Sequence, residues 1–175
     1  MGMPMSRPGH EALRRTFRPG NVRVLFVGES PPASGRFFYR RDSGLYRAMR
    51  NLFEKADPSV QDENFLQRFR ECGCYLVDLC GEPVDKLESN ARRAAHLAGE
   101  RSLRQRISRL QPEVIVSLCR SIGPNVSRAA AAANWTGPIM DVPYPGRWIH
   151  HNRVFTAKLL PFVKRILRSV LNPAI

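Results

Sequence analysis

The sequence lacks the features that mark several large classes of proteins. No apolar run approaches the roughly 18 to 20 residues that a membrane-spanning helix requires. The first residues have no apolar core like that of a signal peptide, and no internal repeat is present. We therefore expect a cytoplasmic protein with no membrane partner.

Motifs for nucleotides and metals are missing as well. The chain has neither a Walker phosphate loop nor a G-x-G-x-x-G turn. This argues against an α/β hydrolase that acts on nucleotides, because such an enzyme needs a phosphate loop or paired metal carboxylates. The four cysteines, Cys72, Cys74, Cys80 and Cys119, do not form C-x2-C pairs. We expect them to be reduced, buried thiols, and we expect no metal and no cofactor.

Acidic residues are few. The chain has 28 lysine and arginine residues against 15 aspartate and glutamate residues, which gives a formal net charge of +13 at pH 7. Such an excess favours a polyanionic partner, most often nucleic acid. The alternative is compositional, because plentiful Ala, Arg, Gly and Pro are typical of a GC-rich genome. The charge is spread along the chain, so it predicts a binding surface rather than a basic tail.

The overall composition of the chain fits one globular domain. Hydrophobic residues make up 43% of the 175 residues and charged residues 25%, which suits a monomer with a single core. We expect residues 1–20 to form a flexible basic N-terminal arm with one short helix at 11–17. Residues 21–175 form the domain.

Apolar segments alternate with amphipathic ones along this domain. Continuous apolar runs, typical of strands buried on both faces, occur at 22–27, 75–79, 113–118 and 139–142. We expect helices after an N-cap at Ser43, around 65–69, at 88–110 with a break near Gly99, at 121–133, and at the C-terminus with a kink or interruption at Pro161. The alternation predicts a three-layer α/β/α fold with a central, mainly parallel four-stranded sheet.

In parallel sheets, ligands bind at the carboxyl ends of the strands. After the first strand, the sequence Gly-Glu-Ser-Pro-Pro at 28–32 places a carboxylate and a hydroxyl on a turn that two prolines stiffen. This turn either positions a reacting water or has Glu29 as a local cap. The Phe-Phe-Tyr run at 37–39 either forms a hydrophobic cluster or offers a flat face to a base.

The segment after the fourth strand, Pro-Tyr-Pro-Gly-Arg-Trp-Ile-His-His at 143–151, is unusual because a loop seldom carries a tryptophan and two histidines so close together. Exposed rings of this kind suit contact with DNA or insertion between bases. Reading His150 and His151 as metal ligands is less favoured, because adjacent side chains diverge on a helix or a strand.

Several motifs occur in a fixed order. They are G-E-S-P-P at 28–32, G-R-F-F at 35–38, S-G-L at 43–45, Y-L-V-D-L at 75–79, P-E-V-I-V-S-L-C at 112–119 and Y-P-G-R-W at 144–148. Their order and spacing resemble the uracil-DNA glycosylase superfamily, and within it the branch with G-E-A-P-G, G-R-P-F, a Thr-Asn strand end, P-x-V-I-V-x-L-G and a His-Pro loop. The resemblance covers residues 22–167.

This resemblance implies a monofunctional DNA glycosylase that initiates base excision repair near the nucleoid. Its partner is single- or double-stranded DNA that contains uracil, a related damaged pyrimidine or an abasic site. In the implied mechanism, Glu29 holds or activates the hydrolytic water with Ser30. Either Tyr144 or one of His150 and His151 donates to the departing base. The implied base pocket consists of Gly28, Pro31, Phe38 and Asp78. The implied DNA contacts are Arg36, Arg147, Trp148, His150 and His151, with Arg147 and Trp148 as a wedge.

The chain also departs from this branch. It has no cysteine before Cys72, so the iron–sulfur cluster of the branch is not expected. Tyr144 stands in place of the branch's histidine, and Asp78 in place of its base-reading asparagine. An amide donates to uracil O4 and accepts from N3–H, whereas an ionised carboxylate only accepts. Three possibilities follow for Asp78. It is protonated and imitates the amide, or it is turned away from the base while backbone groups read the base. Alternatively, it has a structural role as a helix cap or as the partner of an arginine.

These departures leave a second function open. The same pocket fits a non-catalytic or trapping module that binds abasic or damaged DNA.

Overall fold

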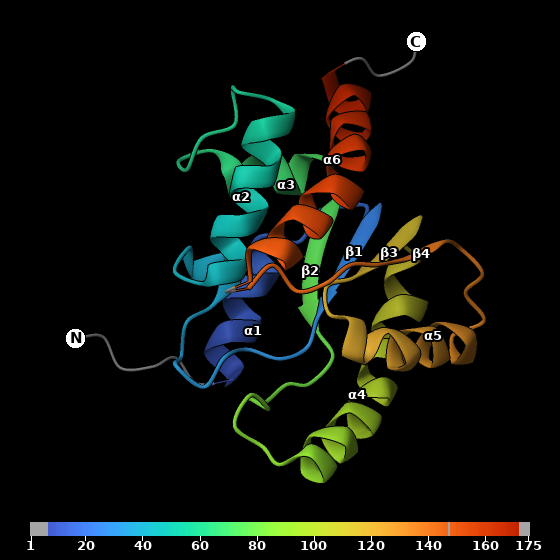
Figure 1. Cartoon of the computed structure of the whole chain (residues 1–175). Coiled ribbons are helices and arrows are strands. Elements are labelled where there is room, and N and C mark those ends of the chain that lie inside the picture. Colours follow the sequence, from blue (N-terminus) through green and yellow to red (C-terminus); the bar gives the residue numbers. More distant parts are fainter. Residues whose placement is uncertain (1–6, 147, 172–175) are drawn as a thin grey trace.

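The computed structural model describes residues 7–171 except Arg147 (Figure 1). The strands are β1 (Val24–Gly28), β2 (Cys74–Asp78), β3 (Val114–Ser117) and β4 (Ile139–Asp141). All neighbouring strands are parallel, in the order β2-β1-β3-β4. The α-helices are α1 (Arg7–Thr16), α2 (Gly44–Ala56), α3 (Phe65–Glu71), α4 (Ser89–Leu110), α5 (Gly123–Ala132) and α6 (Ile149–Leu171), and two 3₁₀ turns are η1 (Phe38–Arg40) and η2 (Arg120–Ile122).

The helices cover both faces of the sheet. Figure 1 shows α2 and α6 together on one side and α4 and α5 together on the other, and each pair is in contact. Every residue of β1 and β2 is buried, as expected for strands covered on both faces. The predicted three-layer α/β/α fold with a four-stranded parallel sheet is therefore confirmed.

The helix after the first strand is formed as the sequence predicts. Ser43 is the N-cap of α2, and its hydroxyl accepts a hydrogen bond from the Tyr46 amide at 3.1 Å. Met49, Leu52 and Phe53 are buried on the inner face of this helix. The helix thereby fixes the position of the turn between β1 and α2.

The expected break in the helix at 88–110 is wrong. Helix α4 runs without interruption from Ser89 to Leu110. A Cβ atom at Gly99 would lie 2.4 Å from the Leu79 carbonyl oxygen, so the glycine allows the helix to pass close to the loop after β2. Helix α6 likewise continues through Pro161, and its axis changes direction partway along (Figure 1).

The N-terminal helix begins earlier than expected and belongs to the domain. Helix α1 starts at Arg7, whereas the sequence predicts a helix at 11–17 within a flexible arm. Arg14 is only 6% exposed, and the Phe17 ring stacks on Tyr39 with centroids 5.4 Å apart. Within the part of the chain that the structure describes, no helix is long and apolar enough to cross a membrane.

Candidate functional site

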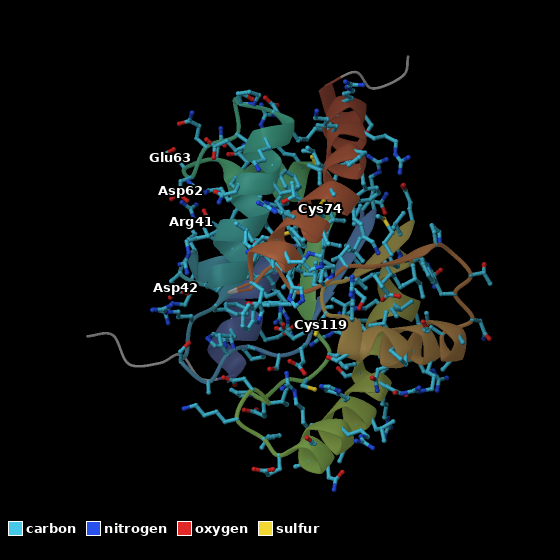
Figure 2. The ribbon with its side chains drawn as sticks, in the orientation of Figure 1. Arg41, Asp42, Asp62, Glu63, Cys74 and Cys119 are labelled. Carbon is cyan, nitrogen blue, oxygen red and sulfur yellow. The ribbon has the colours of Figure 1, made fainter. Side chains whose placement is uncertain are left out.

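A pocket of about 170 Å³ lies at the carboxyl edge of the sheet. The site residues predicted from the sequence that line it are Ser30, Pro31, Arg36, Phe38, Asp78 and Tyr144. Gly28 lies beside them, because β1 and β2 pair Gly28 with Asp78. A Cβ atom at Gly28 would be 2.9 Å from Asp78 Oδ1, so only glycine leaves this carboxylate its place. Cys119, which follows β3, is partly exposed and is labelled between the sheet and α5 in the view of Figure 2.

The turn that carries Ser30 is fixed by the loop after β2. The Val84 amide donates to the Ser30 hydroxyl at 3.2 Å, and the Cys80 amide donates to the Glu29 carbonyl at 2.8 Å. Pro31 is buried. The first two strand ends therefore form one connected wall of the pocket.

The aromatic run at 37–39 is buried rather than exposed. Phe38 is 3% exposed and packs edge-on or tilted against other rings of the core, which are Tyr39, Tyr46, Phe65 and Phe69. Of the two possibilities that the sequence left open, the structure shows the hydrophobic cluster. Phe38 still lines the pocket, so the cluster forms part of the pocket wall.

Tyr39 ties this cluster to the sheet. Its hydroxyl donates to the Leu76 carbonyl at 3.1 Å and accepts from the Leu76 amide at 2.8 Å. Leu76 lies in β2, at the edge of the sheet, so Tyr39 satisfies backbone groups that an edge strand otherwise leaves unpaired.

The Glu29 carboxylate points towards α4. Arg92 donates to it through two nitrogens, at 2.7 Å and 2.5 Å, and His96 Nε2 lies 2.7 Å from Oε1. Burial raises the pKa of Glu29, but the hydrogen bonds with Arg92 and His96 outweigh burial, and the net shift is downward. Glu29 is therefore an anion at neutral pH, held in place by two side chains one helical turn apart.

Sequence reasoning missed Arg92 and His96. Their spacing of four residues places them on the same face of a helix, and that signal was available. The sequence gives no indication, however, of which face of α4 meets the end of β1.

The Asp78 carboxylate has an arginine partner from α1. Arg14 donates to Asp78 Oδ2 at 2.6 Å, and Arg106 donates to the Asp78 backbone carbonyl at 3.1 Å. Burial raises the pKa of Asp78, and the charges of Arg14, Arg106 and His10 offset only part of that rise, so the net shift is upward. Because a guanidinium stays protonated, the contact with Arg14 favours the carboxylate over the protonated acid. The structure thus shows Asp78 as the partner of an arginine, one of the possibilities that the sequence left open.

Of the residues predicted to contact DNA after β4, Trp148 lies immediately before α6, and His150 and His151 lie in its first turn. Trp148 is 70% exposed and Ile149 69% exposed, and His150 and His151 begin the helix rather than belonging to the loop. Tyr144, also predicted there, is 45% exposed and lines the pocket. Arg147 lies outside the described residues. Among the residues that are described, no cluster of three or more His, Cys, Asp or Glu side chains is arranged to hold a metal ion.

Comparison with known proteins finds no family model that matches this chain, and no curated protein that matches it.

Proposed function

We propose that this protein is a monofunctional DNA glycosylase that hydrolyses the N-glycosidic bond of uracil, or of a related damaged pyrimidine, flipped out of DNA. The observation that supports the proposal is the pocket at the carboxyl edge of the sheet. It combines residues of three separate segments, among them Ser30, Asp78 and Tyr144. Its volume of about 170 Å³ is below the roughly 300–1,000 Å³ of sites for drug-sized ligands and suits a single ring.

Glu29 directly precedes Ser30 of the pocket, although its own carboxylate points towards α4 and does not line the pocket. Cleavage of an N-glycosidic bond passes through an oxocarbenium-like sugar, and a fixed carboxylate stabilises its positive charge. A carboxylate has about four lone-pair sites, and the bonds with Arg92 and His96 occupy three of them within the described part of the chain. The remaining site, on Oε2, can orient the attacking water.

The departing base leaves with the electron pair of the broken bond, as an anion. Tyr144 lies at the pocket with its ring half-exposed, so its hydroxyl can donate to the base oxygen on which this charge collects. Ser30 lies on the turn after β1. Its hydroxyl already accepts from the Val84 amide, and its proton is available to a water or to the base.

DNA binding draws on the overall charge and on the surface around the pocket. The net charge of +13 attracts the phosphate backbone. Arg36 lines the pocket and is exposed, and Trp148, exposed immediately before α6, would fill the gap that a flipped base leaves.

One observation favours a second candidate function. Hydrogen bonds from Arg92 and His96 occupy most of the acceptor sites of the Glu29 carboxylate. The carboxylate is therefore less able to accept a proton from water. A module that binds abasic or damaged DNA without cleaving it needs only the pocket and the charged surface. Catalysis is therefore the property to be tested first.

The test is the formation of abasic sites. Oligonucleotides carrying uracil, 5-hydroxyuracil or 5-hydroxycytosine at one position are incubated with the protein and then treated with alkali, which breaks the strand at abasic sites. Scission at the modified position supports the glycosylase. Absence of scission on all substrates, together with preferential binding to abasic DNA, supports the binding module, and absence of both contradicts the proposed function.

A further inference from the structure

We propose that Arg14 holds Asp78 as a hydrogen-bond acceptor and that the pocket therefore favours a pyrimidine with an amino group at position 4 over the corresponding 4-oxo pyrimidine. This inference rests on the proposed function and names the substrate class of the same site. Arg14 is then a specificity-determining residue that acts through Asp78.

The pair is built into the fold. Arg14 and Asp78 come from α1 and from the end of β2, and their side chains are 7% and 9% exposed. Arg14 also forms an ion pair with Glu11, and its guanidinium lies 5.3 Å from the centre of the Phe37 ring. An arginine with three such neighbours has little freedom to leave, so Asp78 keeps a permanent cation beside one of its oxygens.

The other oxygen of Asp78 is not bound by Arg14. Oδ2 is taken by Arg14, whereas Oδ1 lies against Gly28 and has no hydrogen-bond partner among the described residues. Asp78 lines the pocket and Arg14 does not. A ligand in the pocket therefore meets an acceptor, while the donor that balances its charge stays behind it.

An acceptor at this position distinguishes the two kinds of pyrimidine. A 4-amino group donates to a carboxylate oxygen without opposition. Uracil presents a 4-oxo group, which repels the carboxylate, and its N3–H lies between two carbonyl oxygens. The asparagine that the resemblance places here reads the uracil edge because its amide both donates and accepts, and Asp78 with Arg14 behind it only accepts.

The experiment uses two pairs of duplexes that differ only at position 4 of one mispaired base. The pairs are 5-hydroxycytosine with 5-hydroxyuracil, and cytosine with uracil, each opposite the same base. Single-turnover excision and equilibrium binding are measured for the full chain. We expect the 4-amino member of each pair to bind about tenfold more tightly or better, the usual effect of one hydrogen bond to a charged group.

Variants then assign the preference to the pair. Asp78→Asn should reverse the preference towards the 4-oxo bases. Since a lone change can leave Arg14 buried without a partner, the double variant Arg14→Gln/Asp78→Asn keeps a hydrogen bond without either charge and should also prefer the 4-oxo bases. Arg15→Gln is the matched control, because Arg15 is 72% exposed and its loss removes the same charge from the same helix.

The outcomes separate this inference from the proposed function. A wild-type preference for the 4-oxo bases, or an unchanged preference in both folded variants, overturns the inference and leaves the glycosylase standing. Failure of the wild type to excise or to bind any of the four bases preferentially contradicts the proposed function itself, and the inference falls with it.

Discussion

At the scale of single residues, the site contains two carboxylates, and each of them forms an ion pair with an arginine. Gly28 and Asp78 are paired in the sheet, so Glu29 and Asp78 lie at neighbouring strand ends. Each has its own arginine, Arg92 for Glu29 and Arg14 for Asp78. Two bare carboxylates so close together would raise each other's pKa values. The separate arginines allow both groups to be ionised at neutral pH.

The role of Glu29 is tested by removing its charge and keeping its shape. Glu29→Gln should lower single-turnover excision by about 10²–10⁴-fold, the usual range for a general base, while affinity for DNA changes little. The loss follows because an amide neither orients the water as a base nor balances the positive sugar. Rapid-quench measurements with the enzyme in saturating excess over DNA give the rate of the excision step, to which product release does not contribute.

Ser30→Ala is the matched variant at the next position. We expect it to lose less activity than Glu29→Gln, because the Ser30 hydroxyl is also engaged by the Val84 amide. If Ser30→Ala abolishes excision while a folded Glu29→Gln retains it, Glu29 is not the group that positions the water.

At the scale of elements, α4 depends on a close approach that only glycine permits. Gly99→Ala should destabilise the protein by about 1–3 kcal/mol, the usual cost of overpacking, because the new methyl group would lie 2.4 Å from the Leu79 carbonyl oxygen. Urea denaturation measures the change. Gly44→Ala at the start of α2 is the control, because its Cβ would have no atom closer than 3.9 Å. Equal stabilities of the two variants would mean that α4 does not pass so close to the loop after β2.

The residue predicted to enter the duplex lies immediately before α6, which begins at Ile149. Trp148→Ala should reduce excision from duplex DNA by about tenfold or more and leave excision from single strands almost unchanged, because only a duplex has a gap to fill. Trp148 is 70% exposed, so its loss should leave the melting temperature unchanged. Leu97→Ala on α4 is the control, because Leu97 is also an exposed apolar side chain, at 54%, and does not line the pocket. Equal losses on single-stranded and duplex substrates would contradict the wedge.

The strands and most helices could be predicted from the sequence because their signals are local. The runs at 22–27 and 75–79 are apolar except for Arg23 and Asp78, and α2 has both its N-cap and its helical spacing. The break at Gly99 was predicted wrongly because the intrinsic cost of glycine in a helix was weighed without its tertiary neighbour. What Gly99 contacts lies twenty residues away in the sequence, and no local pattern reports it.

The sequence predicted that certain residues lie at one edge of the sheet, but not which side chains pair with one another. Ser30, Asp78 and Tyr144 were expected to meet because they follow parallel strands or lie in the last loop. The partners of the carboxylates were not predicted, since Arg14 lies 64 residues from Asp78 and Arg92 lies 63 from Glu29. In a chain with 24 arginines, the sequence offers too many equivalent partners to choose among them.

At the scale of the whole molecule, the net charge of +13 predicts binding that is mainly electrostatic. If six to ten phosphates are neutralised, affinity for an oligonucleotide should fall by about 10³–10⁵ between about 50 and 200 mM salt, because binding releases counterions. Fluorescence anisotropy at several salt concentrations measures the slope. A flat dependence on salt would contradict a nucleic-acid partner.

The central claim is that the pocket at the carboxyl edge of the sheet binds a flipped base and that the bond joining this base to the sugar is hydrolysed there. The most direct measurement is the intact mass of an oligonucleotide with one damaged pyrimidine after incubation with the wild type and with Glu29→Gln. We predict that the wild type converts the strand to one that has lost the base and gained water, with the free base released, and that Glu29→Gln does so far more slowly. An unchanged mass with the wild type on every damaged pyrimidine, or equal conversion by both proteins, would contradict the account.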